Sequence, residues 1–253
     1  MLTVTEVLGR SEQGMTRPFI CKTEDGRLWY VKGKYAGQRS LCCEWVAGCL
    51  AERMALPIPE FAIVNVPKSL VAGSDRPDIR HLGEGPAFAS LKLPDAREIT
   101  WSESEELNGL ERSLIVLFDC WVQNEDRSLS SFGGNPNLLI TDHRSSDGGE
   151  PYTFNGRKIW TYDFNLAFDR VFDAARFWEN HIFAKVYDLA RMLELFEPMR
   201  LLREEVPEIF RQIPQEWLYI DGDESLPAQL EETQVVEVLQ RAFIDPERFW
   251  RKL

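Results

Sequence analysis

The sequence predicts an α+β fold, with a β-rich N-terminal part followed by a mainly helical C-terminal part. Short strand-like runs fill the first 95 residues, whereas apolar residues recur mostly at helical spacing thereafter. Strands and helices are thus segregated along the chain, which favours α+β over a wound parallel sheet. We expect two domains, 1–95 and 96–253, and 44% hydrophobic residues supply enough apolar material for a substantial core.

The N-terminal part is expected to form a sheet with one helix. Its helix begins at Ser40 and ends before Pro57, because Leu41, Trp45 and Cys49 recur at helical spacing. An Asp-Gly pair, which accepts positive φ, marks a hairpin turn between two of the strands. The predicted strands are Thr3 to Leu8, Pro18 to Thr23, Leu28 to Lys32, Phe61 to Val66 and Pro86 to Leu93.

The C-terminal part is expected to be helical around one small hairpin. Helix 107–122 is predicted from an apolar stripe, and further helices are expected at about 177–195, 198–212 and 228–243. The stripe consists of Leu107, Leu110, Leu114, Phe118 and Trp121. Two short strands, Asn137 to Thr141 and Lys158 to Tyr162, flank a polar segment, Asp142 to Arg157, that we interpret as an exposed loop.

The charge balance bears on the partners of the protein. Lys and Arg total 29 and Asp and Glu total 41, so the net charge is −12. Such a chain repels phosphate backbones and anionic lipid, so we expect neither nucleic acid nor membrane partners. The N-terminus does not resemble a signal peptide and no apolar run is long enough to span a bilayer, which predicts a cytoplasmic protein.

The cysteines and histidines do not indicate a metal centre. The five cysteines are odd in number and include no CxxC pair, so we interpret them as small buried hydrophobes in a reducing compartment. The three histidines, at positions 81, 143 and 181, lack the spacing of zinc ligands.

Two residues of the N-terminal part suit the binding of a phosphate group. Phosphoryl transfer from ATP needs a cation on the phosphates, a carboxylate for magnesium, and an acceptor for the proton of the nucleophile. Lys32 ends a predicted strand, where it could reach the phosphates; the alternative is an ordinary solvent lysine. Glu44 in the following helix could pair with Lys32 and fix its position, or it could be a solvated helical glutamate.

Candidate acids and amides follow in the C-terminal part. Asp126 comes after an apolar helix, a rigid support that suits a catalytic base, although an ordinary loop acid fits there too. Asn135 and Asn137 precede a strand, where an amide oxygen could bind Mg²⁺ or serve only in a turn. Asp163 leaves an apolar strand, where burial is costly without a cation; the alternative is a turn aspartate.

The order of these candidates along the chain is informative. A lysine strand, a glutamate helix, then Asp, Asn, a hairpin and Asp is the arrangement of protein kinases. We therefore expect a two-lobed protein-kinase-like fold, with a sheet and one helix in the N-lobe and a mainly helical C-lobe. Asp126 and Asn135 are nine positions apart, against five in H-R-D-x-x-x-x-N, which leaves the choice between Asn135 and Asn137 open.

Several short motifs follow one another along the first 175 residues. They are Val31-Lys32-Gly33, Glu44-Trp45-Val46-Ala47, Leu56-Pro57-Ile58-Pro59, Phe88-Ala89-Ser90, Asn124-Glu125-Asp126-Arg127, Asn135-Pro136-Asn137-Leu138-Leu139 and Tyr162-Asp163-Phe164. With these motifs in this order, the sequence from about residue 3 to 175 resembles the HipA-like kinases, in the compact branch without an extra N-terminal subdomain.

The resemblance implies roles for the candidate residues. Lys32 would bind the ATP phosphates and Glu44 would orient it. Asp126 would be the catalytic base, and Asp163 would be the main Mg²⁺ ligand. Asn135 would be a further Mg²⁺ ligand, with Asn137 as its substitute.

The resemblance also implies how the nucleotide is held. The segment Ser90 to Leu93, including Leu91, would be the hinge that hydrogen-bonds adenine through its backbone. Gly9 to Gly14 would be the phosphate loop. HipA proteins autophosphorylate a serine there, and Ser11 is the candidate here.

The acceptor of the phosphoryl group is not fixed by the sequence. The resemblance implies a serine/threonine protein kinase, a role as a toxin or growth regulator, and an antitoxin partner. It favours a protein substrate over a small molecule, and a small-molecule kinase remains an alternative. A pseudokinase that binds a partner without turnover is another. The kinase hypothesis requires Lys32, Asp126 and Asp163 to converge on one crevice that holds ATP and Mg²⁺.

Overall fold

The computed structural model describes residues 1–11, 16–142, 151–186, 189–221, 223–244 and 246–250. The chain forms two compact units, each built from discontinuous segments. The first unit comprises Met1–Trp45, Pro59–Leu93 and Gln212–Leu230; the second comprises Val46–Ile58, Pro94–Arg211 and Glu231–Leu253. The mixed α+β class is confirmed, whereas the division into lobes at residue 95 stays a prediction.

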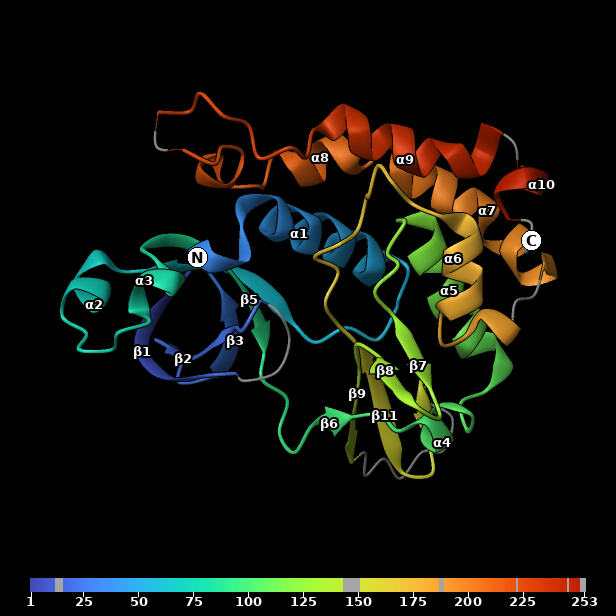
Figure 1. Cartoon of the computed structure of the whole chain (residues 1–253), viewed down its shortest axis with the longest axis horizontal. Helices are drawn as coiled ribbons and strands as arrows, with labels where there is room; N and C mark the ends of the chain where they lie inside the picture. The colour runs from blue at the N-terminus through green and yellow to red at the C-terminus, as the bar shows by residue number, and fades with distance from the viewer. Residues whose placement is uncertain (12–15, 143–150, 187–188, 222, 245, 251–253) are drawn as a thin grey trace. The chain divides into compact units, whose positions relative to one another are not determined.

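A closed five-stranded barrel dominates the first unit, with strand order β1-β2-β3-β5-β4 (Figure 1). Neighbouring strands run antiparallel except β1 and β4, which pair in parallel and close the barrel. The strands are β1 (Leu2–Arg10), β2 (Phe19–Thr23), β3 (Leu28–Lys32), β4 (Phe61–Val66) and β5 (Gly85–Leu91). All five predicted strands are therefore present, with β1 two residues longer than expected at its end because Gly9 and Arg10 pair with Ile20 and Phe19.

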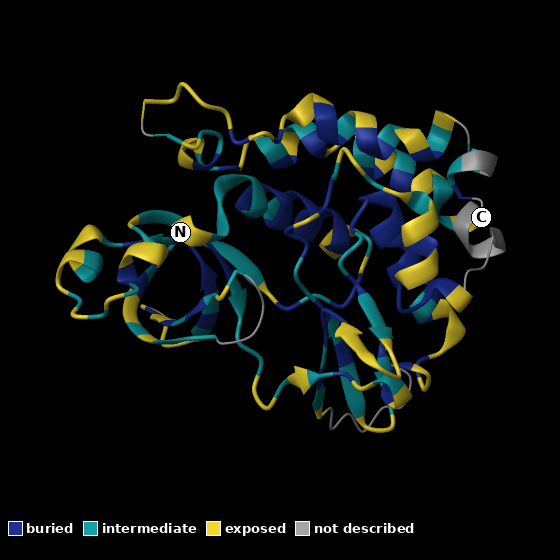
Figure 2. Ribbon diagram, viewed as in Figure 1, coloured by how far each residue is buried: buried dark blue, intermediate teal, exposed yellow. Residues whose placement is uncertain are grey.

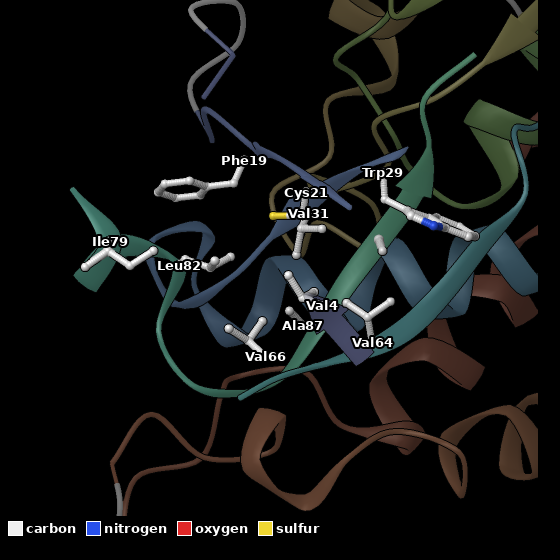
Figure 3. Close-up of a cluster of buried hydrophobic side chains, with 11 residues drawn as sticks. Val4, Phe19, Cys21, Trp29, Val31, Val64, Val66, Ile79, Leu82 and Ala87 are labelled. Atoms are coloured by element: carbon white, nitrogen blue, oxygen red, sulfur yellow. The ribbon is translucent and has the colours of Figure 1, made fainter. Parts of the chain in front are cut away.

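Buried apolar side chains gather in this unit, as Figure 3 shows for the cluster around Val31 and Val4. Trp29 is fully buried there, and its indole Nε1 donates to Thr23 Oγ1 at 2.9 Å, so its polar atom is satisfied. Cys21 belongs to the same cluster, and burial raises the pKa of its thiol to about 12. All five cysteines are buried and free, which confirms their predicted role as small hydrophobes.

Helices accompany the barrel in the first unit. They include η1 (Lys34–Ala36), α2 (Lys68–Ala72), α3 (Ile79–Leu82) and η3 (Gln215–Trp217). Trp217 is buried and its indole Nε1 donates to Pro86 O at 3.0 Å, so the segment Gln212–Leu230 is fastened to β5. The predicted helix from Ser40 is α1 (Gln38–Arg53), whose last part, from Val46, is assigned to the second unit.

The second unit is mainly helical and has α5 (Gly109–Trp121) at its centre. Asn108 caps α5, because its side-chain oxygen accepts from Glu111 N at 2.9 Å. Most of α5 is buried (Figure 2), and Trp121 Nε1 donates to the carbonyl of Leu239 in α9. Leu110, predicted to belong to the buried stripe, is 42% exposed, whereas its neighbour Glu111 in the same turn is buried. The other helices are α4 (Trp101–Ser104), α6 (Ala174–Asn180), η2 (Ala184–Val186), α7 (Leu189–Arg203), α8 (Val206–Phe210), α9 (Glu232–Ile244) and α10 (Pro246–Phe249).

Two small sheets complete the second unit. One has strand order β10-β11-β9-β6, and the other is the hairpin β7-β8. The strands are β6 (Arg97–Glu98), β7 (Ser128–Ser130), β8 (Gly133–Asn135), β9 (Leu138–Asp142), β10 (Thr153–Phe154) and β11 (Arg157–Thr161). The predicted hairpin is thus β9-β11; its loop carries the short strand β10, and residues 143–150 of that loop lie outside the described residues.

The helices after residue 170 differ from the prediction. A single helix at 177–195 was wrong, because His181 adopts extended angles (φ −62°, ψ 132°) and ends α6. A break before Pro198 was also wrong, since this proline lies inside α7. Among the described residues, no helix is long and apolar enough to cross a bilayer.

Candidate active site

Lys32 and Glu44 form an ion pair in the first unit. Lys32 ends β3 and Glu44 lies in α1, and Lys32 Nζ contacts Glu44 Oε1. The two residues are only 8% and 2% exposed, so the ammonium is held in one place rather than moving freely in solvent. Gly33 follows at a point of close packing: a Cβ there would lie 1.9 Å from the carbonyl oxygen of Leu82.

The segment expected to contact phosphate, Gly9 to Gly14, starts inside a strand. Gly9 belongs to β1, and just past the end of β1 the N–H of Ser11 donates to Pro18 O at 2.8 Å. Arg10 closes the base of this loop, because its Nε donates to Arg17 O at 2.9 Å. Gly14 lies outside the described residues.

The expected hinge begins inside β5. Ser90 pairs with Tyr30 and Phe61 on its two sides, and Leu91 is the last residue of the strand. The N–H groups of Leu91 and of the next residue, Lys92, donate to the carbonyls of Glu60 and Leu28 at 2.7 and 2.8 Å.

Those two donors are therefore already engaged. A backbone contact from this segment to adenine would have to use the carbonyls or Leu93, which is the last residue of the first unit's middle segment.

Asp126 stands in the loop that follows α5 in the second unit. Asn137 Nδ2 donates to the backbone carbonyl of Asp126 at 3.0 Å and to its Oδ2 at 3.1 Å, so one amide fixes both the loop and the carboxylate. Asn135 also hydrogen-bonds this carboxylate. Both candidate asparagines therefore converge on the candidate base.

Asp163 lies close enough to Asp126 for the two charges to interact. Burial raises the pKa of Asp126, and repulsion by Asp163 adds to the rise, whereas the hydrogen bonds from Asn135 and Asn137 oppose it. Asp163 has φ of 61° and Asn137 has φ of 46°, in the left-handed region that non-glycine residues rarely occupy. Strained backbone of this kind clusters at functional sites.

The residues around this carboxylate pair fit a divalent cation. A cation between Asp126 and Asp163 would relieve their repulsion, and Mg²⁺ prefers the oxygen ligands that Asp and Asn provide. Two residues after Asp163, Asn165 has a buried Oδ1 without a hydrogen-bond partner among the described residues. Within the same described part of the chain, no three His, Cys, Asp or Glu side chains gather as metal ligands, so such an ion would rely on Asp163, amide oxygens and water.

The hairpin β7-β8 accounts for the long interval between Asp126 and Asn135. Ser128 pairs with Asn135 at its base, and Phe132 at its tip is fully exposed. Gly134 has φ of 154°, and a Cβ there would lie 2.5 Å from Ser128 O, so the turn back toward Asn135 requires glycine. The four extra residues thus form a short hairpin rather than an irregular loop.

A second, fully buried carboxylate lies in the same unit and was missed by sequence reasoning. Asp119 in α5 accepts from Arg127 Nε at 2.6 Å and from Asn124 Nδ2 at 3.1 Å, and His181 Nε2 lies 3.0 Å from it. Burial opposes ionisation, but Arg127 and His181 hold the pKa of Asp119 below its ordinary value. A charged residue inside the apolar run Phe118 to Trp121 was the signal in the sequence, because it needs a buried partner.

Two groups of predicted residues are thus brought together, each within its own unit. Lys32 meets Glu44, and Asp126 meets Asn135, Asn137 and Asp163. The convergence of these two groups on one nucleotide stays a prediction.

A family model described as HipA-like kinase matches residues 4–253, which is nearly the whole chain. A search of curated proteins finds no match to this sequence.

Proposed function

The chain belongs to the HipA-like kinase family, a family of kinase-type phosphotransferases, and on this basis we propose that it is an ATP- and Mg²⁺-dependent serine/threonine protein kinase. The proposal includes a two-lobed protein-kinase-like fold, in which Lys32, Glu44 and the segments 9–14 and 90–93 bind the nucleotide. Asp126, Asn135, Asn137 and Asp163 would then perform and support the transfer.

One observation carries the proposal beyond the family name. Asp126 is held by two asparagines beside a second carboxylate, Asp163, and burial together with that neighbouring charge raises the pKa of Asp126. A higher pKa makes a carboxylate a better proton acceptor, which a kinase base requires. The mutual repulsion of the two acids also favours the binding of a cation near them, and magnesium-bound ATP supplies such a cation.

In the proposed reaction, the hydroxyl oxygen of the acceptor attacks the γ-phosphorus of ATP. A new P–O bond forms to the acceptor, and the bond between the γ-phosphorus and the bridging oxygen breaks, with its electron pair leaving on ADP. The hydroxyl proton passes to Asp126. Lys32, oriented by Glu44, would bind the α and β phosphates.

Asp163 would be the main ligand of the metal, with Asn135 or Asn137 as a further one. Bound Mg²⁺ neutralises charge on the phosphates. Asn137 already donates to Asp126 through its Nδ2, so its metal-binding group would have to be Oδ1, whereas Asn135 sits at the exposed end of β8.

A polypeptide acceptor is favoured over a small molecule by the surroundings of Asp126. The hairpin beside it is exposed from Ser130 to Asn135 and ends in a fully exposed phenylalanine. An open apolar tip suits an extended partner better than an enclosed metabolite. The role of a toxin or growth regulator, and an antitoxin partner, are proposed from the family alone.

The test is incubation with γ-labelled ATP and Mg²⁺, alone and with cell extract, followed by mass spectrometry of the labelled products. We expect labelled serine or threonine in a protein, and labelling of the protein itself at Ser11 if it autophosphorylates. Asp223→Asn, a change at an exposed acid, is the matched control for Asp126→Asn and should label as the wild type does.

Other outcomes would select an alternative. A labelled metabolite without labelled protein would indicate a small-molecule kinase. ATP binding without any labelled product would indicate a pseudokinase.

A further inference from the structure

We propose that Arg127 is a positioning residue that sets the separation of Asp126 and Asp163, an inference that rests on the proposed function. Arg127 directly follows the candidate base, and its guanidinium is fully buried. The phosphoryl-transfer chemistry described above makes no use of its charge.

The guanidinium first anchors to α5. Its Nε donates to Asp119 Oδ2 at 2.6 Å and its Nη2 lies 3.5 Å from Asp119 Oδ1, so the two groups meet through two parallel contacts. Asp119 is on a buried part of a central helix, so this end of the arginine has a rigid support. A planar guanidinium fixed on one edge presents its remaining N–H groups in a defined direction.

The other edge of Arg127 reaches the segment that holds Asp126. Its Nη1 donates to Asn137 O and, at 3.3 Å, to Pro136 O. The side chain of the same Asn137 donates to Asp126. Arg127 therefore holds in place the residue that holds the base.

The backbone carbonyl of Asn137 also connects Arg127 to the segment that contains Asp163. Tyr162 N donates to Asn137 O at 3.2 Å, which fixes the residue before Asp163. On the other side of Asp163, the ring of Phe164 lies against the guanidinium, with its centroid 5.6 Å from Arg127 Cζ. Arg127 thus contacts or connects to both neighbours of Asp163 as well as the partner of Asp126.

His181 keeps this cluster electrically neutral. Phe183 N donates to His181 Nδ1 at 3.1 Å, so Nδ1 is an acceptor and the proton must lie on Nε2, which faces Asp119. Burial lowers the pKa of His181, which favours this neutral form. A backbone hydrogen bond adds to this contact, because Ile182 N donates to Arg127 O at 3.1 Å. One aspartate and one arginine charge then balance, and Arg127 is held from both sides.

The first test is Arg127→Lys. Lysine keeps the positive charge beside Asp119 but cannot bond Asp119 and the Asn137 carbonyl through one planar group. We expect kcat per folded molecule to fall at least about 100-fold, because small displacements of reacting groups cost that much, with the KM for ATP changed less than about threefold.

The second test removes the charges together, in case the lysine variant does not fold. In Asp119→Leu/Arg127→Met the buried pair is replaced by apolar side chains, which commonly preserves stability. A thermal midpoint near that of the wild type with kcat still reduced about 100-fold supports positioning. Wild-type kcat in either folded variant overturns it, because the cluster would then only stabilise the fold.

A third measurement does not depend on activity. Hydrogen exchange at the Tyr162 amide, measured on either variant without nucleotide, should become at least about tenfold faster than in the wild type when Asn137 O loses its arginine donor. Unchanged exchange overturns the inference. Faster exchange in a protein whose wild type transfers no phosphate supports the positioning and refutes the proposed function instead.

Discussion

The second unit contains two carboxylate clusters, around Asp119 and around Asp126, and the pKa of the central acid is shifted in opposite directions in the two. Asp119 is fully buried, with an arginine, an asparagine and a histidine around it, and its pKa is lowered. Asp126 is only partly buried, with amides and a second carboxylate around it, and its pKa is raised. The two acids are only seven positions apart in the chain. The difference in their pKa values therefore comes from the side chains that the fold places around each of them.

The difference is that between a supporting cluster and the cluster that we propose to be reactive. The charges of Asp119 and Arg127 cancel each other, and His181 is neutral. This cluster therefore needs no additional ion to balance its charge. Asp126 and Asp163 repel each other, and burial also raises the pKa of Asp126, whereas the charge of Arg127 lowers it. An arrangement that is unfavourable alone but becomes favourable with a bound cation is what a metal-nucleotide site requires.

The largest expected effect is on catalysis at Asp126. Asp126→Asn should lower kcat by about 100- to 10,000-fold, because the amide cannot take the proton from the acceptor. ATP affinity should be retained, since Asp163 rather than Asp126 is the proposed main ligand of the metal that accompanies ATP. Transfer kinetics and calorimetric ATP titration of the same preparation check both statements.

The same variant should unfold at a higher temperature at pH 7. A folded-state pKa above the unfolded value means that ionisation of Asp126 costs stability as the pH rises through that interval, and the amide that replaces the carboxyl cannot ionise. The amide also preserves an oxygen that can accept from Asn137. A lower midpoint for Asp126→Asn would show that the charge of the wild-type carboxylate is balanced after all.

Removal of Asp119 from the neutral cluster should destabilise the fold, in contrast to the stabilisation expected for Asp126→Asn. Asp119→Ala leaves Arg127 buried without its carboxylate, which costs about 3–5 kcal/mol of unfolding free energy. Denaturant unfolding measures it. The control is Glu197→Ala, which removes the exposed partner of Arg200 and should leave the midpoint almost unchanged. Equal midpoints for the two variants would contradict the distinction between buried and exposed pairs.

A smaller effect concerns pH. The pKa of His181 is lowered in the folded protein, so above about pH 6.5 the residue is neutral in both states and contributes no pH dependence. As the pH falls below that value, the unfolded chain binds the proton first and stability is lost. His181→Gln should flatten the fall of the thermal midpoint between about pH 6.5 and 5. An unchanged slope would mean that the pKa of His181 is the same in the folded and unfolded chains.

The smallest effect is expected at the hairpin tip. Phe132 is fully exposed, so Phe132→Ser should change the unfolding free energy by less than about 0.5 kcal/mol. Gly134→Ala serves as the contrasting variant in the same hairpin, because its Cβ would meet Ser128 O. A large loss in Phe132→Ser would show that this ring is packed rather than exposed.

The sequence predicted the residues that we propose to be reactive but not the buried pairs that support them. Lys, Glu, Asp, Asn and Asp follow a recognisable order, and the strands before Lys32 and Asp163 have clear alternation or apolar character. The pairing of Asp119 with His181 spans 62 positions, and no local pattern connects a helical aspartate to a distant histidine. Only the folded chain brings them together.

Two predicted helix boundaries were wrong, because the periodicity of apolar residues does not determine where a helix ends. The end of α6 is set by His181, whose ring turns into the buried cluster, so the helical pattern was wrongly extended through it. Pro198 was taken as a helix boundary, yet it lies within α7, which therefore continues through a residue that has no backbone N–H. The barrel strands were predicted well because alternation and turn residues coincide there.

The contrast between the two clusters is tested most directly by calorimetric titration of ATP into the wild type and into Asp163→Asn, each with and without Mg²⁺. We predict that Mg²⁺ strengthens ATP binding to the wild type at least about tenfold and that Asp163→Asn loses this enhancement. Equal enhancement in both proteins, or none in the wild type, would contradict the proposal that Asp163 is the main ligand of a metal-nucleotide site.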